Sequence, residues 1–536
     1  MQEGSFIWSY VEQQHRAVDK RNDSLWLVFL LLASVILFTV NLGGLPLQDG
    51  DEGIVATVAR EILQAPSDSL RWLYPTLAGE PYHDKPPLIH WLVAGAYAMG
   101  GINEWTTRLP GALLMAISVP LLYCIGREIF RQRWAAIYSA LIYLTMLPVV
   151  RYGRLAIMEG AIACFLMTMI LCLLRSRRDL RYCLGVGISF GLICLTHGKI
   201  GLCLGVVTLI FLYWDTPRLL TCYYFWLAIL IGCIPVGCWY GLQVLQYGYS
   251  FTEMDTKISL ITVKSISNSH GKLPWYYLME IAKWTWPWLI FLPATFRITW
   301  ENNNFSWAKL LIVWFGVYLL LISLISIKLP WYILPIYPSL ALAFGYQLTQ
   351  IENLPLFSGY PRIWVTSLAI LAVLASTASI YFSCRSTSKI ELQIIFASVA
   401  LTMTLAAILA ERGDRQFLKI LVWGSYLSLL LLMKSNFWIW ELNTLYPVKP
   451  VAAMISRLNP EVTEVYTSFP YHRPSLDFYS DRTIIPMSVN QLQSYWGYHQ
   501  KPYFLVNKPT LENLQLKSVR ILDQAEDWQL ITKDNN

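Results

Sequence analysis

The chain has 536 residues, of which 55% are hydrophobic and only 14% are charged, and its mean hydropathy is +0.44. A soluble domain carries about 25% charged residues, so the composition excludes a soluble protein and predicts a polytopic membrane protein. The net charge of +7 does not indicate a nucleic-acid partner, because the Lys and Arg residues cluster in short loops, where they set membrane topology.

A polar N-terminal segment, residues 1–24, precedes the first long apolar run and is expected in the cytoplasm. Each apolar run that follows is long enough to cross a bilayer with some tilt or thinning. About thirteen transmembrane helices are expected, near residues 25–44, 108–126, 134–151, 156–174, 182–197, 199–214, 222–245, 276–297, 307–326, 331–349, 362–383, 390–410 and 417–434. The shorter run 86–100 is expected to form a re-entrant or interfacial helix, with Pro86 or Pro87 in its first turn.

The basic residues of the loops predict the orientation of this transmembrane domain, residues 25–436. The strongest basic clusters lie in the loops near 127–133, 175–181 and 412–419. With a cytoplasmic N-terminus, all three fall on the cytoplasmic side, as membrane proteins prefer. A full span at 86–100 would move the two strongest clusters outside. The large first loop, 46–90, and the C-terminal residues are then extracytoplasmic.

The C-terminal residues 437–536 differ in character from the rest of the chain. Short strand-like runs at 464–469, 483–486, 503–507 and 519–522 alternate with helical patterns at 451–458 and 489–495. We therefore expect an all-α polytopic membrane protein with a small extracytoplasmic α/β domain. No cysteine follows Cys384, so this domain folds without disulfides.

The first loop gathers three carboxylates, Asp49, Asp51 and Glu52, directly after a membrane span. The next residues have the spacing of an amphipathic helix lying on the membrane interface. Asp51 and Glu52 are candidates for a general base or for a ligand of a divalent cation beside a phosphate. The alternative is structural, since Asp51 or Asp49 can serve as the N-cap of the helix.

The same loop ends in Tyr82-His83-Asp84-Lys85, in which Lys85 can pair with a phosphate as a point charge. A lysine at a membrane edge can also simply extend its amine to the interface. Glu159 stands at the outer mouth of a span, where an acid usually faces a cavity. Its alternative role is an ion pair with Arg151 or Arg154.

Three further polar sites fall on the outer side in this topology. His197 and Lys199 flank Gly198 inside an apolar stretch, which suggests a break between two spans with side chains in a cavity. His270 lies in the outer loop before a group of aromatic residues, and Lys328 lies between two apolar runs. The gathering of acids, bases and aromatic residues on one face favours an active site there.

Six blocks of sequence, in this order, resemble the GT-C membrane glycosyltransferases, in particular the bacterial aminoarabinose-transferase and protein-mannosyltransferase-like group. The blocks lie within residues 45–345 and are DEGIVATVAREIL (51–63), YHDKPPLIHWL with NEWTTRLPGAL (82–92 and 103–113), RYGRLAIMEG (151–160), LTHGKIG (195–201), SHGKLPWYYL (269–278) and SIKLPWYILPIYP (326–338).

The resemblance implies a glycosyltransferase of the cytoplasmic (inner) membrane with a polyprenyl-phosphate-linked sugar donor. The sugar is transferred with inversion to an extracytoplasmic acceptor, which is lipid A, another glycolipid, a glycan or a protein. It implies that Asp51, with Glu52, is catalytic and that the donor phosphate is held by a set of residues supported by Glu159 and His270. That set is Lys85, Tyr82, His197, Lys199 and Lys328. A divalent cation at Asp51 is compatible with the chemistry, but no ligand set demands a cofactor.

Three positions depart from the family pattern. Ile54 and Val55 stand where aminoarabinose transferases often have Arg and Tyr, and His197 stands where relatives have Lys. The sugar therefore stays open. Two other readings also stay open: a polytopic flippase or transporter of lipid-linked glycans, and a non-catalytic relative. A transporter would carry charges through the whole membrane thickness, whereas here they gather at one face.

Overall fold

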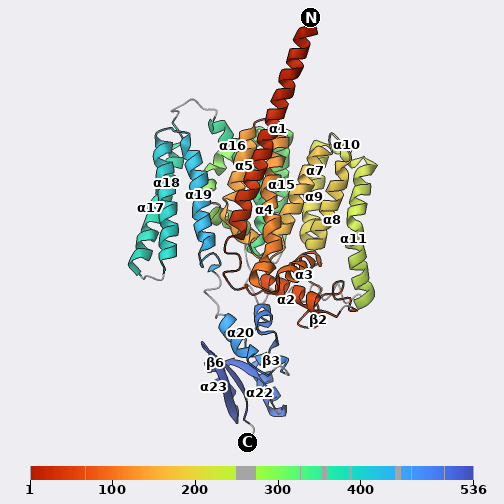
Figure 1. Cartoon of the computed structure of the whole chain (residues 1–536), viewed down its shortest axis with the longest axis vertical. Helices are drawn as coiled ribbons and strands as arrows, with labels where there is room; N and C mark the ends of the chain where they lie inside the picture. The colour runs from red at the N-terminus through yellow and green to blue at the C-terminus, as the bar shows by residue number, and fades with distance from the viewer. Residues whose placement is uncertain are drawn as a thin grey trace.

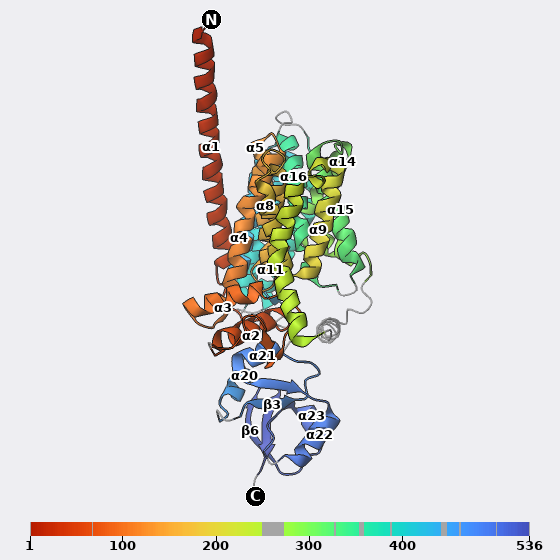
Figure 2. The ribbon, with the colours of Figure 1, turned by 90° about the vertical axis from the view of Figure 1, so that its right-hand side faces the viewer.

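The computed structural model describes residues 2–66, 68–248, 273–325, 328–352, 359–385, 389–440, 448–459, 462–499 and 501–534, with the side chains described from residue 21 onward. A bundle of long helices makes up most of the molecule, and a small α/β domain lies at one end of it (Figure 1). The first helix begins at the opposite end of the long axis from this domain (Figures 1 and 2). The expected fold class is therefore confirmed.

The main helices of the bundle are α1 (Gln2–Thr39), α4 (Glu104–Ile129), α5 (Arg133–Leu144), α6 (Leu147–Gly153), α7 (Glu159–Arg175), α8 (Tyr182–Thr196), α9 (Gly198–Asp215), α11 (Tyr223–Tyr247), α15 (Ser306–Leu324), α16 (Tyr337–Glu352), α17 (Arg362–Arg385), α18 (Ile390–Glu411) and α19 (Gln416–Lys434). They are joined mostly by short connections, apart from those between α1 and α4 and between α11 and α15. Shorter elements among them are α10 (Pro217–Leu220), α13 (Tyr276–Trp284), η1 (Trp288–Phe291), α14 (Leu292–Glu301) and η2 (Pro330–Ile336).

By length and apolar composition, eight of the described helices can each cross a membrane. A ninth span is counted if α5 and α6 are taken together, since they are bent by 59° at a short break. The predicted number of about thirteen spans is not reached by this criterion and stays a prediction. The helices are sufficient to make the chain an integral membrane protein.

Small residues let neighbouring helices of the bundle approach closely. A Cβ atom on Gly187 or Gly191 of α8 would lie 1.9 Å from a backbone oxygen of α11, at Ala228 and Gly232 respectively. The spacing of these two glycines is the Gly-x-x-x-Gly pattern that allows helix backbones to pack together in a bilayer. This tight crossing fixes α8, whose C-terminal end carries His197.

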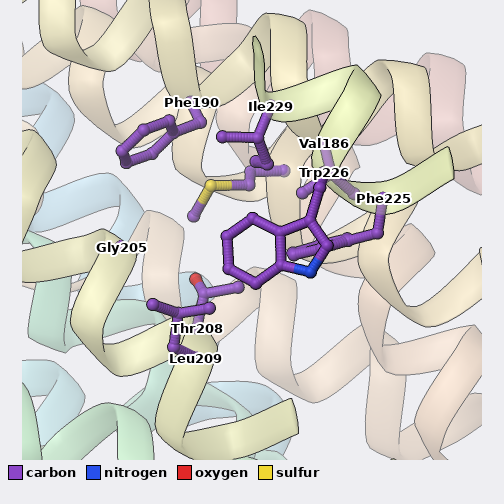
Figure 3. Close-up of a pocket in the computed structure, with 9 residues that line it drawn as sticks. Val186, Phe190, Gly205, Thr208, Leu209, Phe225, Trp226 and Ile229 are labelled. Atoms are coloured by element: carbon purple, nitrogen blue, oxygen red, sulfur yellow. The ribbon is translucent and has the colours of Figure 1, made fainter. Parts of the chain in front are cut away.

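An apolar pocket lies between α7, α8, α9 and α11 (Figure 3). Its lining includes Phe190, Trp226 and Met169, and it encloses about 370 Å³ of space, counting its open mouth. The lining residue Thr208 donates its hydroxyl to the carbonyl of Leu204 at 2.9 Å. The pocket is therefore a hydrocarbon site with no ionisable lining residue, and the polar chemistry must lie elsewhere.

The first loop forms two helices between the bundle and the α/β domain (Figure 1). α2 (Asp51–Gln64) and α3 (Leu88–Gly100) pack against each other, and the hairpin of β1 (Thr76–Leu77) and β2 (Glu80–Pro81) connects them. α3 is a short apolar helix that lies across the end of the bundle (Figure 2). Its N-cap is Pro87, so this proline directly precedes the first turn, in which Pro86 or Pro87 was expected.

The C-terminal domain has a five-stranded sheet in the order β4-β3-β5-β7-β6. β4, β3 and β5 are parallel, and β7 and β6 continue the sheet antiparallel. Its elements are α20 (Val448–Ser456), β3 (Glu464–Thr467), α21 (Pro474–Ser480), β4 (Thr483–Pro486), α22 (Val489–Tyr498), β5 (Phe504–Asn507), α23 (Lys508–Leu514), β6 (Val519–Ala525) and β7 (Trp528–Lys533).

Alternate residues of the strands bury opposite faces of this sheet, as strand geometry requires. Leu505 of β5 packs in the cluster formed with α20 and α21, whereas Phe504 and Val506 pack in the cluster formed with α22 and α23. Helices therefore cover both faces. The α20–α21 layer faces the first loop and brings the domain against the membrane bundle (Figure 2).

Candidate active site

Asp51 and Lys85 form a buried ion pair at the membrane-facing end of the first loop. The Lys85 Nζ donates to Asp51 Oδ1 at 2.7 Å, and the two side chains are only 8% and 12% exposed. Burial lowers the pKa of Lys85, but the charges of Asp51 and Asp84 outweigh it, so that its pKa is raised and the amine stays protonated. A fixed cation is thus held beside a carboxylate.

The N-cap alternative for Asp51 is wrong. Gly50, with a φ of 84°, is the N-cap of α2 and forms no side-chain cap, and Asp51 is the first helical residue. Glycine adopts this backbone conformation without steric cost. The turn at Gly50 therefore frees the Asp51 carboxylate to face Lys85.

Glu159 faces the same site from the membrane bundle. It is the first residue of α7 and is 2% exposed, and the charges of both Asp51 and Lys85 act on it. The expected ion pair with Arg151 or Arg154 is wrong: among the described residues Glu159 has no salt-bridge partner, and its Oε2 has no hydrogen-bond partner. Arg154 instead donates to the carbonyls of Leu37 and Val40.

Glu52 points away from Lys85 into a different network. Its two carboxylate oxygens accept from the Arg108 guanidinium at 2.7 and 2.9 Å, and also from the backbone N–H groups of Gln48 and Ala156. Arg108 and Glu52 are 0% and 1% exposed. The predicted catalytic role of Glu52 is not supported by these contacts, because its acceptor positions are already engaged. We assign it a structural role.

His197 lies at the break between α8 and α9, where it caps both helices. This confirms the expected interruption of the span. The side chain is buried, the charges of Lys85 and Asp51 act on it, and its ring lies 5.7 Å from that of Tyr332. His197 therefore lies near the Asp51–Lys85 pair, whereas the side chain of Lys199 is exposed.

Lys328 and Tyr82 are each held by contacts of their own. Lys328 is 6% exposed, precedes η2 and donates its amine to the carbonyl of Ile325 at 3.0 Å. The ring of Tyr82 packs in a small cluster with Ile54 and Val58 of α2. Their predicted roles in holding the donor phosphate stay predictions.

Helix α2 does not lie on the membrane interface as expected. Residues from Glu52 to Ala59 are buried, because α3 covers one side of the helix and α21 the other. The apolar spacing predicted the helix correctly but not its partner, since α21 follows α2 by about 400 residues of sequence.

His270 lies outside the described residues, so its predicted supporting role is untested. Within the described part of the chain, no group of three or more His, Cys, Asp or Glu side chains is arranged to hold a metal ion. The divalent cation considered for Asp51 therefore stays a prediction.

The C-terminal domain closes over the first loop through two arginines that the sequence did not single out. Arg473 donates to Asp49 Oδ2 at 2.5 Å, and Ser475 donates to the other oxygen of Asp49. At the other end of α21, Arg60 of α2 donates to the carbonyls of Asp477 and Phe478. Both ends of α21 are thus fastened to the loop that carries Asp51.

Arg108 is a further residue that sequence reasoning missed, although its block was recognised. It lies inside an apolar helix, and an arginine there needs a partner. The need for a partner could have marked Arg108 as important. Its partner Glu52 lies 56 positions away, so the sequence did not identify the pair. The guanidinium also donates to the carbonyls of Leu42, Leu45 and Pro46. It therefore shapes the chain just before the Asp51 turn.

Comparison with known proteins supports the class indicated by this fold and site. Residues 84–239 match the family of dolichyl-phosphate-mannose-protein mannosyltransferases. An uncharacterized protein of Aquifex aeolicus is 25% identical over 85% of this chain and 87% of its own length. The undecaprenyl phosphate-alpha-4-amino-4-deoxy-L-arabinose arabinosyl transferase of Yersinia enterocolitica is 26% identical over 61% of this chain.

The alignment spans 59% of the length of that arabinosyl transferase. The crystal structure of ArnT from Cupriavidus metallidurans bound to undecaprenyl phosphate superposes with a TM-score of 0.74, covering 95% of this chain and 98% of that chain at 18% identity. The chain is therefore similar to the membrane glycosyltransferases of the GT-C superfamily. Within that superfamily it is aminoarabinose-transferase-like.

Proposed function

We propose that this protein transfers a sugar from a polyprenyl-phosphate-linked donor to an extracytoplasmic acceptor, with inversion at the anomeric carbon. The observation that carries the proposal is the buried Asp51–Lys85 pair, a carboxylate and a fixed cation 2.7 Å apart at the membrane edge. The names of the relatives support the donor: the arabinosyl transferase is named for undecaprenyl phosphate, and the ArnT crystal structure is bound to this lipid. The acceptor is lipid A, another glycolipid, a glycan or a protein.

In the proposed reaction an acceptor hydroxyl attacks the anomeric carbon of the donor sugar. The bond between that carbon and the phosphate oxygen breaks as the new glycosidic bond forms, and polyprenyl phosphate leaves with the electron pair. Asp51 takes the proton of the acceptor hydroxyl as general base. Lys85 holds the phosphate and neutralises the charge that it gains on leaving. A single displacement of this kind inverts the configuration.

The pairing of Asp51 with Lys85 suits this division of roles. A phosphate that binds Lys85 competes with Asp51 for the ammonium group and leaves the carboxylate available to the acceptor. The buried Glu159, which has no salt-bridge partner among the described residues, lies close enough to interact electrostatically with both Asp51 and Lys85. Asp51 and Lys85 are therefore held close together before either meets its substrate.

The orientation is part of the proposal. The basic loops of the bundle favour a cytoplasmic N-terminus. The first helix begins at the opposite end of the molecule from the C-terminal domain (Figure 2), which is consistent with opposite sides of the membrane. The first loop and the C-terminal domain are then extracytoplasmic, on the side where a lipid-linked donor serves in place of a nucleotide sugar.

Replacing Asp51 with Asn tests the proposal directly. In membranes supplied with a polyprenyl-phosphate-linked sugar, we expect D51N to lower the rate of transfer by about 100-fold or more, the contribution of a general base. The matched control is Asp68→Asn, an exposed acid of the same loop, which should keep the wild-type rate. Undiminished transfer by D51N would exclude Asp51 as the base, and the absence of any transfer by the wild type would favour the transporter or non-catalytic alternatives.

A further inference from the structure

Two polar clefts adjoin at the amino ends of the parallel strands β4, β3 and β5, and Thr463 lines both of them. They enclose about 590 and 640 Å³, counting their open mouths. The first cleft is lined on one side by Arg60 and Glu61 of α2 and on the other by Arg482 of the C-terminal domain. Because the clefts share Thr463, they lie side by side between the first loop and the C-terminal domain's strands, and we refer to them together as the groove.

Two aromatic rings stack face to face in the second cleft, and the outer face of the exposed His499 ring forms a flat platform. The rings of Tyr495 and His499 are stacked with centroids 3.6 Å apart and planes within 9°. Tyr466 lies 4.3 Å from Tyr495, and Tyr503 completes the lining. His499 is exposed and Tyr495 half-buried, so the platform is accessible. Flat rings of this kind pack against the C–H faces of sugar rings, and a tyrosine adds a polar tip.

Hydrogen-bonding groups surround the platform. Glu464 accepts from the Tyr466 hydroxyl at 2.5 Å, which in turn accepts from Tyr495 at 2.7 Å. A carboxylate has about four acceptor positions, so Glu464 retains capacity for ligand hydroxyls. Lys501 contributes an exposed ammonium group to the same cleft. Convergent acceptors and donors beside an apolar face are typical of sites that orient a polar ligand.

The charges along the groove nearly cancel. Its basic residues are Arg60, Arg482 and Lys501, and its acidic residues include Glu61, Glu464 and Asp481. Arg60 pairs with Asp481 at 3.2 Å. A groove for a polyanion would present one sign of charge along its length. The balance here favours an uncharged, hydroxyl-rich ligand.

The groove lies within reach of the proposed catalytic centre. Arg60 and Asp51 are on the same helix, nine residues apart, which is about 14 Å along its axis. We propose that this groove binds a neutral, polyhydroxylated glycan segment of the acceptor, while another part of that acceptor reaches Asp51. The inference rests on the proposed transferase function and assigns the C-terminal domain a role in acceptor selection.

Binding of neutral hexasaccharides to the full-length protein in nanodiscs tests this inference. Maltohexaose, cellohexaose and chitohexaose serve as probes, measured by calorimetry and by saturation-transfer NMR. We expect at least one of them to bind, and Tyr495→Ala to weaken that binding by about ten-fold, the equivalent of about 1.4 kcal/mol. The matched control is Tyr498→Ala on the same helix, a side chain that is 89% exposed and outside both clefts.

Lys501→Ala provides a second variant that leaves the packing of the domain intact, because this side chain is exposed. It should also weaken the binding of the hexasaccharide. The inference is overturned if none of the three probes binds, if Y495A and K501A bind as the wild type does, or if inositol hexaphosphate binds in their place. The D51N variant separates the two proposals, since it should lose transfer and keep hexasaccharide binding.

Discussion

Adjacent carboxylates at the start of α2 have different partners, because neighbouring helical residues point about 100° apart. Asp51 faces Lys85, whereas Glu52 neutralises Arg108 in a fully buried pair. Removing one partner of such a pair leaves an uncompensated charge inside the protein. Replacing Asp51 and Glu52 by their amides should therefore have different effects on stability.

We predict that Glu52→Gln lowers the free energy of unfolding by about 3–5 kcal/mol, as expected for a broken buried ion pair. Asp51→Asn should lower it less, because the amine of Lys85 still lies near the charge of Asp84. Thermal unfolding of both variants in detergent measures the difference. Equal melting temperatures for E52Q and the wild type would contradict the structural role of Glu52.

The pair His472–Asp477 predicts a pH-dependent stability of the C-terminal domain. Burial alone would lower the pKa of His472. The hydrogen bond to Asp477 at 2.6 Å and the charges of Asp477 and Asp49 outweigh burial, so the pKa lies above its usual value. A raised histidine pKa means that the protonated form stabilises the fold. This contribution is complete below the ordinary pKa of 6.5 and is lost as the pH rises through the raised pKa.

Replacing His472 with Gln should flatten this dependence. Between about pH 6 and about pH 9, a range that spans histidine titration, we expect the melting temperature of the wild type to fall more than that of H472Q. Parallel curves for the two proteins would show that the pair makes no contribution. Arg473→Lys offers a comparison, because it keeps the charge beside Asp49 while the histidine is unchanged.

At the scale of elements, the contact of α2 with α21 depends on Gly53. A Cβ atom there would lie 2.7 Å from the backbone nitrogen of Ser475 and 3.2 Å from the carbonyl carbon of Pro474. Backbone atoms cannot rotate away as a flexible side chain can, so the two helices must separate. The contact is continued by Thr57, which donates its hydroxyl to the carbonyl of Pro474 at 3.2 Å.

We predict that Gly53→Ala lowers both the melting temperature and the rate of transfer, although alanine is the better helix former by about 0.5–1 kcal/mol. Gly95→Ala in α3 is the matched control, since a Cβ atom there would meet nothing within 4 Å. It should be neutral or stabilising. Limited proteolysis of the C-terminal domain measures the loosened contact, and equal protection of the two variants would argue against this packing.

The strands of the C-terminal domain were largely predictable, and the exception has a physical reason. β3, β4, β5 and β6 begin within a residue of the positions expected from their β-branched and aromatic runs. β7 was missed, because the hairpin that joins it to β6 turns at Glu526, whose φ is +55°. Such a turn usually contains Gly or Asn, so the sequence held no signal for it.

The candidate site was predictable where its residues share a segment or a recognised motif. Asp51 and Lys85 belong to one loop, and His197 breaks an apolar run, so each was expected at the site. The bonds of Glu52 to Arg108 and of Asp49 to Arg473 join distant segments. Local spacing carries no information about such pairs, and the roles of Glu52 and α2 changed accordingly.

At the scale of the whole molecule, the proposed orientation predicts which side of the membrane each loop faces. Cys384, at the end of α17, is exposed and should lie on the same side as the C-terminal domain. We predict that a membrane-impermeant maleimide labels Cys384 in intact cells. Cys384→Ser should abolish this labelling.

A cysteine in the loop between α4 and α5 provides the opposite control. In the C384S background, Arg131→Cys places a thiol at an exposed position of a predicted cytoplasmic loop. It should react only after the membrane is permeabilised. Labelling of R131C in intact cells, with protection of Cys384 in the wild type, would invert the orientation and remove the active site from the outer face.

The ion pair between Asp49 and Arg473 joins residues 424 positions apart. A ribosome adds about 5–20 residues per second, so roughly 20–85 s separate the synthesis of the two partners. During that interval Asp49 has been synthesised, but Arg473, which will donate to its carboxylate, has not. In the proposed orientation, the loop that carries Asp51 therefore reaches its final form only after Arg473 has been synthesised and has crossed the membrane.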